Sequence, residues 1–362
     1  MNAVDPASGR PGGPGAGGVR ARAPRPRWTA ARLGTMVLSL ALLLPTLARA
    51  AQRFPQTTLD PQSDYAGLIQ RLLVDLVFWV VLILVVVEGV LIVTVLRFRA
   101  RPGAPQPKAV HGNTALEIAW TIAPALILAA IAVPTVSTIF RTQSPAPAGA
   151  LAVRVVAHQW WWEFRYPRLG VVTANELHVP VGRPVELTLE SADVIHSFWV
   201  PAIGGKRDVV PAHLNRLWFT PRTTGTFPGQ CAEMCGISHA NMRMTLVVEP
   251  PTDFEHWVTL QRSPPAEPAA DSAAVRGREM FENVGCAACH TVRGVSAGVL
   301  GPDLTHLASR SSIAGAVYPN TPEMLGKWIE DPPARKPGTQ MPKLGLQPGQ
   351  ITDLVAYLRS LR

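Results

Sequence analysis

The chain has 362 residues, enough for two or three domains. Hydrophobic residues make up 47% of it and charged residues only 16%, a balance that indicates membrane segments beside globular parts. The formal net charge is +9, but residues 1–50 carry seven arginines against one aspartate and supply six of those charges. The remainder is nearly balanced, which excludes a broad basic surface for nucleic acid.

The first 50 residues are predicted to be an export signal behind a disordered basic start. Residues 1–35 are rich in Gly, Pro, Ala and Arg and show no apolar period. The apolar run that follows ends in Ala48-Arg49-Ala50, a small-x-small cleavage signal. Because this run is too short to span a membrane comfortably, cleavage near Ala50 is favoured over an uncleaved helix.

Two apolar stretches predict a transmembrane hairpin over residues 66–143. Leu72–Leu96 would extend about 37 Å as a helix, enough to cross with some tilt. Ile118–Phe140 is the second span, and the two prolines inside it are tolerated in membrane helices. The connection is rich in basic residues, which places it in the cytoplasm and both ends of the mature chain outside. These basic residues are Arg97, Arg99, Arg101 and Lys108.

Helical periods vanish after a Pro/Ala/Ser-rich stretch near residue 144. Segments such as "LAVRVVAHQWWWEFRY" and "NMRMTLVVEP" indicate short strands separated by Gly/Pro turns. About 110 residues of this kind, 150–260, predict a β-sandwich with Greek-key connections. A Pro/Ala-rich linker, 261–272, then leads to a small all-α domain at 273–362.

All four cysteines fall into two tight clusters, which indicates metal or haem chemistry and not a disulfide scaffold. The first cluster places Cys231, Cys235, His239 and Met242 in a C-x3-C-x3-H-x2-M pattern. A disulfide here would close a tiny ring and restrain little chain entropy. Zinc is bound by Cys, His, Asp or Glu and not by methionine, whereas a thioether beside thiolate and imidazole selects copper.

Two cysteines in one loop allow two thiolates to bridge two copper ions, each of which then needs one histidine. His239 supplies one imidazole, so the other must come from elsewhere in the sandwich. His196 is the best candidate because it starts a strand after a turn. Three rivals are more simply explained as surface or hydrogen-bonded core histidines: His158, His178 and His213.

The second cluster, Cys286-Ala-Ala-Cys289-His290, is a C-x-x-C-H haem-attachment motif. The two thiols would bond the haem vinyl groups, and His290 would supply the proximal ligand. A thioredoxin-like site is the rival, but it would need a βαβ context. Met341, in a Pro-bounded loop before the final helix, is the candidate sixth ligand; a different or displaceable ligand is the alternative. Packing is the simpler role for the methionines inside helical periods, Met280 and Met324.

The first cluster, with "HQWWWEF", "DVIHSFWVP" and "GGKRDVVPAHLN", resembles subunit II of haem–copper cytochrome c oxidases over about residues 65–260. The resemblance implies a cupredoxin-like sandwich with a binuclear copper centre, CuA. It makes Trp160 the residue that receives electrons, at the surface above copper. It also implies a magnesium ion, shared with subunit I, at the Glu233 side chain. The implied copper ligands are the thiolates of Cys231 and Cys235, the imidazoles of His196 and His239, the Met242 thioether and the Glu233 carbonyl.

The C-terminal region resembles class I cytochromes c, including "GPDL" after the haem motif. That pattern implies Pro302 against the proximal histidine, and first and last helices that cross at Gly277 and Tyr357. A cytochrome c domain fused to subunit II implies a caa-type oxidase.

The resemblance therefore implies a subunit of a cytochrome c oxidase. Electrons from cytochrome c, or a similar donor, would pass through haem c and CuA to subunit I, where oxygen becomes water and protons are pumped. No oxygen site is evident on this chain. Partners would be subunits I and III and membrane lipid, with no nucleic acid. The location implied is a bacterial cell membrane, multi-pass, with both redox domains on the periplasmic face.

Two acids belong to the membrane part. The resemblance places Glu117 at the cytoplasmic mouth of a proton pathway in subunit I; a helix-start acid favoured by the dipole is the alternative. Glu88 lies deep in the first span, where charge is costly, so its partner is expected on another subunit.

Two other functions fit part of the sequence. A stand-alone membrane-anchored electron carrier needs only one anchor, so two spans and Glu117 argue against it. A CuA and haem c subunit of a related reductase, such as a nitric oxide reductase, is the other alternative.

Fusion of the cytochrome c domain to subunit II also changes how electrons would reach the copper centre. We expect internal transfer to depend weakly on salt, because no diffusional encounter is needed. The acidic residues available to a basic donor are Glu163, Glu176, Glu186, Glu190 and Asp193.

Overall fold

The computed structural model describes residues 56–103, 105–106, 112–268 and 272–362. The predicted signal at 1–50, Lys108 of the basic connection and part of the 261–272 linker lie outside the described residues.

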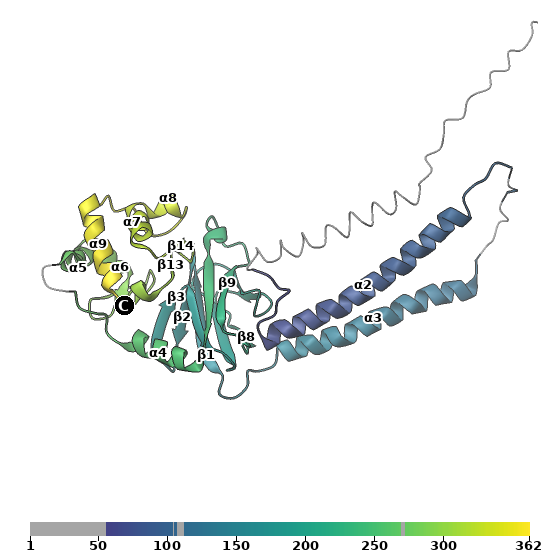
Figure 1. Ribbon diagram of the computed structural model, residues 1–362, viewed down its shortest axis with the longest axis horizontal. Helices are drawn as coiled ribbons and strands as arrows, with labels where there is room; N and C mark the ends of the chain where they lie inside the picture. The colour runs from purple at the N-terminus through teal and green to yellow at the C-terminus, as the bar shows by residue number, and fades with distance from the viewer. Residues whose placement is uncertain (1–55, 104, 107–111, 269–271) are drawn as a thin grey trace, which may run out of the picture. The chain divides into compact units, whose positions relative to one another are not determined.

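Two long apolar helices form the N-terminal part of the described chain, α2 (Asp64–Arg97) and α3 (Thr114–Thr142) (Figure 1). Both are long and apolar enough to cross a membrane, and none of the most apolar stretch of either is buried. Each begins before the apolar run predicted from sequence, because Ser63 and Asn113 cap the first turn and accept hydrogen bonds from Ala66 N and Leu116 N.

The start of α2 is fixed to the β domain by buried contacts. The Ser63 hydroxyl donates to the carbonyl of Ile203 at 2.5 Å. Asp64 accepts from the amide of Thr220 at 2.7 Å. A Cβ on Gly204 would lie 2.0 Å from the Tyr65 ring, so only glycine allows this close approach.

The β domain is a sandwich of two five-stranded sheets (Figure 1). The first has the order β3-β2-β1-β5-β8 and the second β4-β10-β9-β6-β7. Most neighbours are antiparallel, but β1 pairs with β5, and β4 with β10, in parallel. The strands are β1 (Leu151–His158), β2 (Trp161–Tyr166), β3 (Val171–Ala174), β4 (Glu176–Pro180), β5 (Val185–Ser191), β6 (His196–Trp199), β7 (Arg207–Val209), β8 (Asn215–Phe219), β9 (Gly225–Cys231) and β10 (Arg243–Glu249).

The sandwich core is built from inward-facing aromatic and aliphatic side chains. Trp162, Phe164 and Tyr166 alternate along β2 and are fully buried. Helix α4 (Pro251–Arg262) covers one region of this core with Phe254. The sandwich therefore gives a rigid frame for the loops at its ends.

The C-terminal domain is mainly helical, with a second hydrophobic core around Phe281 and Tyr357. Two short ribbons, β11–β12 and β13–β14, are added to the predicted all-α arrangement. The elements are α5 (Ala273–Asn283), α6 (Cys286–Cys289), β11 (Thr291–Val292), β12 (Ser296–Ala297), η2 (Leu307–Ser309), β13 (Ser312–Ile313), β14 (Tyr318–Pro319), α7 (Pro322–Glu330), α8 (Pro332–Arg335) and α9 (Pro348–Ser360).

Helices α5 and α9 cross in close contact at Gly277. A Cβ there would lie 2.0 Å from the Asp353 carbonyl oxygen and 2.8 Å from Cβ of Tyr357. The absence of a side chain therefore lets the two backbones touch, and the crossing places the haem-attachment motif beside the end of α5.

Candidate metal centres

The copper-binding residues implied by the resemblance meet at one end of the sandwich. Cys231 ends β9, His196 begins β6, and the one-turn helix η1 (His239–Asn241) carries His239. The Cys231 and Cys235 sulfurs lie 3.7 Å apart, and neither cysteine forms a disulfide. His196 Nδ1 is 3.9 Å from the Cys231 sulfur, and His239 Nδ1 is 3.4 Å from the Cys235 sulfur.

The two weaker donors lie at the same place. The Met242 sulfur is 3.8 Å from the Cys235 sulfur, and the Glu233 carbonyl oxygen is 3.2 Å from the Cys231 sulfur. Thus two thiols, two imidazoles, a thioether and a carbonyl surround one small volume. This set has the soft donors that favour copper, so the residues present fit a copper pair.

Asp193 orients one of the imidazoles. Its carboxylate accepts a hydrogen bond of 2.7 Å from His196 Nε2, which leaves Nδ1 free to face the sulfurs. Burial works against ionisation of Asp193, but hydrogen bonds from His196 and from two backbone amides hold the carboxyl pKa below its usual value. Sequence reasoning had counted Asp193 only among acidic docking residues.

Because the two sulfurs lie 3.7 Å apart, the ionisation of each thiol depends on the other. The hydrogen bond from Cys235 lowers the pKa of the Cys231 thiol far below its usual range, and the reciprocal bond raises the pKa of Cys235. One thiolate therefore forms readily, and the second needs a cation to displace its proton.

The rival histidines lie outside this group. Among the described residues, His196, Cys231 and Cys235 are the histidine and cysteines whose ligand atoms all lie within 4.8 Å of one another. His158 stacks on Trp161, with ring centroids 4.1 Å apart, and His213 is exposed. His178 contacts Glu249.

Trp160 lies directly against the copper loop. Its indole nitrogen donates a hydrogen bond of 2.9 Å to the carbonyl of Cys235, and Gln159 donates to the same oxygen at 2.7 Å. The sequence prediction of a surface position is wrong, because only 7% of Trp160 is exposed. Residues of the C-terminal domain cover it.

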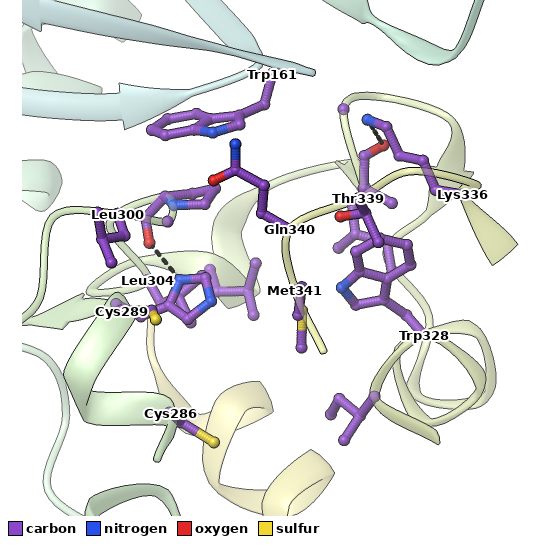
Figure 2. A pocket seen from close by; sticks show the side chains of 18 of the residues that line it. Trp161, Cys286, Cys289, Leu300, Leu304, Trp328, Lys336, Thr339, Gln340 and Met341 are labelled. Carbon is purple, nitrogen blue, oxygen red and sulfur yellow. Dashed lines mark hydrogen bonds between the residues drawn. The ribbon is translucent and has the colours of Figure 1, made fainter. Parts of the chain in front are cut away.

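The haem-binding residues predicted from the sequence line one pocket. Figure 2 shows Cys286, Cys289 and Met341 around this pocket. The His290 Nδ1–H donates 2.8 Å to the carbonyl of Pro302, so Nε2 is left for the iron. Burial lowers the pKa of His290, which favours the neutral imidazole that a metal requires. The residues present therefore fit a covalent haem.

Several lining residues were missed by sequence reasoning. Trp161, Gln340 and Trp328 line the same pocket (Figure 2). Arg310 is buried and donates to the Asp303 carbonyl at 2.5 Å, while its Nε atom has no partner among the described residues. Trp161 belongs to the β domain, so the pocket is completed by a neighbouring domain. No sequence motif predicts such a contact between two domains.

Glu117 and Glu88 remain where the sequence placed them. Glu117 lies in the first turn of α3, and Glu88 lies within α2; both are exposed in the described structure. The Glu233 side chain is also exposed.

The chain is similar to known proteins along most of its length. Three family profiles match: "Cytochrome C oxidase subunit II, transmembrane domain" over residues 55–138, "Cytochrome C oxidase subunit II, periplasmic domain" over 168–250, and "Cytochrome c" over 274–362. A cytochrome c oxidase subunit 2 of Alkalihalophilus pseudofirmus is 37% identical over 313 residues, covering 84% of this chain and 91% of the relative. The chain belongs to the cytochrome c oxidase subunit II family.

Other family members named cytochrome c oxidase subunit 2 are similar along most of their length. The Bacillus subtilis protein is 32% identical, with 90% of this chain and 97% of the relative covered. That of Bacillus sp. strain PS3 is 36% identical, covering 73% and 80%. The resemblance inferred from the motifs is thereby confirmed, and the fold of two apolar helices, cupredoxin-like sandwich and cytochrome c domain agrees with it.

Family membership makes this chain a subunit of an oxidoreductase complex. The two matched redox domains imply copper and haem c as its cofactors. With the two apolar helices, it is a membrane-anchored protein with periplasmic domains.

Proposed function

We propose that this chain is the electron-accepting subunit II of a caa-type cytochrome c oxidase. In this role it takes electrons from cytochrome c or a similar donor, through haem c and CuA, and delivers them to subunit I. Subunit I then reduces oxygen to water and pumps protons. The observation that carries the proposal is the convergence of six copper donors beside a haem-binding pocket in one chain.

At the copper centre the roles follow the geometry. Cys231, Cys235, His196 and His239 would hold the copper pair with two thiolates and two imidazoles. When bound, the copper pair would supply one-electron chemistry. The Met242 thioether and the Glu233 carbonyl would be additional, weaker donors to the pair. Burial of both cysteines excludes water, and the sandwich holds the donors nearly still.

At the haem the chain supplies four residues. Cys286 and Cys289 would attach the haem covalently, and His290 and Met341 would bind its iron, which would supply one-electron chemistry. The Pro302 carbonyl fixes the imidazole ring, and Gly301 leaves room for it, since a Cβ there would lie 2.5 Å from His290 Cε1. The indole of Trp160, hydrogen-bonded to the Cys235 carbonyl, would connect the copper loop to the haem side.

The membrane part is proposed to cross the bacterial cell membrane twice, with both redox domains outside. Helices α2 and α3 have the required length and hydropathy. Glu117 would then face the cytoplasmic mouth of the proton pathway in subunit I, and Glu88 would pair with another subunit. Subunit III and lipid are the further proposed partners. Glu233 would contribute its exposed carboxylate to a magnesium ion at the boundary with subunit I.

Oxygen consumption by the purified complex tests the proposal. With a reduced cytochrome c as donor, Cys235→Ser should abolish turnover, while the haem c spectrum stays unchanged. His213→Gln, a change of an exposed histidine, is the matched control and should keep wild-type turnover. Normal turnover in Cys235→Ser would refute the proposed route.

A further inference from the structure

Two glycine-containing turns of the cytochrome c domain lie on Trp160. A Cβ on Gly315 would lie 2.9 Å from the Trp160 carbonyl oxygen and 3.0 Å from that of Asn241. A Cβ on Gly338 would lie 2.8 Å from Cη2 of Trp160. Both glycines have positive φ angles, of 81° and 82°, which other residues rarely adopt. Each turn therefore needs glycine both for its backbone conformation and for the lack of a side chain. The turns also leave no room for another protein above the Trp160 indole.

Lys336 joins the same two domains from inside the contact. Only 3% of it is exposed, and its Nζ donates to the Trp160 carbonyl at 2.5 Å and to the Ala314 carbonyl at 2.9 Å. Within the described part of the chain, no carboxylate lies within ion-pair distance of it. If the domains separated without water, the Lys336 amine would lose the Trp160 carbonyl and leave it unpaired, whereas its bond to Ala314 lies within the cytochrome c domain and would remain.

Glu176 makes the reciprocal contact from the β domain. Its carboxylate is 4% exposed and accepts hydrogen bonds from the Ser311 amide at 2.7 Å, the Ser311 hydroxyl at 2.5 Å and the Ser312 amide at 3.2 Å. His178 lies behind it, 3.7 Å from the other carboxylate oxygen. A buried carboxylate is stable only when it is well hydrogen-bonded, and here the cytochrome c domain supplies those bonds.

Two further hydrogen bonds close the contact near the copper loop. The Ser238 hydroxyl donates to the Pro337 carbonyl at 2.5 Å, and the Arg243 amide donates to the Gly315 carbonyl at 3.0 Å. Transient electron-transfer encounters rely on exposed charges that steer approach and are weakened by salt. This contact instead buries its polar groups and satisfies them, as lasting interfaces do.

We propose that Glu176 and Lys336 are positioning residues that lock the cytochrome c domain over Trp160. The copper centre then receives electrons only from this chain's own haem and is closed to soluble cytochrome c. This inference rests on the proposed function and adds to it a restriction on the donor. The external donor must deliver to the haem, and loosening the lock should open a second, direct route to copper.

Stopped-flow reduction of the whole complex by reduced soluble cytochrome c tests the inference, with haem c followed in the visible and copper in the near infrared. In the wild type, copper should be reduced only after haem c, with a lag, and the internal step from haem to copper should depend little on salt. In the Glu176→Gln/Lys336→Met double variant, a copper phase without lag should appear, linear in donor concentration and slowed by salt. The lock should weaken about 10- to 100-fold from the lost buried hydrogen bonds.

A second readout does not depend on electron transfer. Amide hydrogen exchange in residues 311–316 should accelerate about 10-fold or more in each single variant, because each weakens the contact that covers this segment. Glu176→Gln leaves the Ser311 and Ser312 amides a neutral acceptor in place of a carboxylate, and Lys336→Met removes the bond to the Trp160 carbonyl. The matched control, Glu186→Gln/Lys327→Met, removes the same charges at partly exposed positions. It should change neither readout.

The possible outcomes distinguish failure of the lock from failure of the proposed function. A direct, salt-dependent copper phase in the wild type would overturn the lock alone and leave the proposed function intact. Faster exchange in the double variant without a direct copper phase would equally overturn it, since an opened contact would then fail to admit the donor. A wild-type complex without copper would refute the proposed function itself, and with it the lock.

Discussion

Replacement of Gly277 by alanine tests the helix crossing that supports the haem pocket. The added Cβ would lie 2.0 Å from the Asp353 carbonyl oxygen and 2.6 Å from its carbonyl carbon. Carbon atoms pack at about 3.5–4.0 Å, so α5 and α9 must separate by roughly 1 Å or more. Overpacking of this kind costs about 1–3 kcal/mol, which for a domain of this size lowers the melting temperature by roughly 5–20 °C.

Thermal unfolding followed by the haem absorbance measures this effect in the full-length protein. Gly326→Ala is the matched control, because it also adds a methyl group inside a helix, α7. Its nearest neighbours, side-chain atoms of Ile351 and Val355, would be 3.7 Å away. This variant should melt at or slightly above the wild-type temperature, since alanine favours a helix by about 0.5–1 kcal/mol. If Gly277→Ala melts no lower than Gly326→Ala, the reasoning about backbone contact is refuted.

Three further changes have predictable outcomes. Asp193→Ala should lower copper affinity about 10- to 100-fold in a competition titration, because His196 loses the partner that orients it; unchanged affinity would contradict that role. Gly301→Ala should disturb the His290 ring and reduce the low-spin fraction in the visible spectrum at equal haem content, and an unaltered spectrum would show that the loop adapts. Burial lowers the pKa of Lys336 from 10.5 to about 7, so the docked state binds fewer protons than the open state between these values. Docking should therefore tighten as pH rises from 7 towards 10, seen as slower exchange at residues 311–316 after correction for intrinsic rates; Lys336→Met should remove this dependence, and a trend of opposite sign would contradict it.

The residues of each cysteine cluster could be predicted from sequence because they lie close together along the chain. Cys231 and Met242 lie within one segment of 12 residues. The C-x-x-C-H motif is likewise confined to one turn of helix, α6 and its end. No fold can move such residues far apart, so residue type and spacing alone indicate the chemistry. His196 lies 35 positions before Cys231, so spacing alone could not select it; its place at the start of a strand after a turn favoured it over three other histidines, and the resemblance agreed.

The contact between the redox domains could not be predicted in the same way. Lys336 and Trp160 are 176 positions apart, and Glu176 and Ser311 are 135 apart. These pairs meet only because two independently patterned domains pack together, and neither domain signals its partner by periodicity. Glu176 therefore looked like one more acidic docking residue, although in the structure it is buried against the cytochrome c domain. Trp160 looked exposed for the same reason.

Metal analysis with electron paramagnetic resonance of the purified full-length protein tests the central claim most directly. We predict two coppers and one iron per chain, and a copper signal whose hyperfine structure shows one electron shared over two nuclei. In Cys235→Ser the shared signal should disappear while the iron remains. One copper per chain in the wild type, or a shared signal that survives Cys235→Ser, would contradict the account.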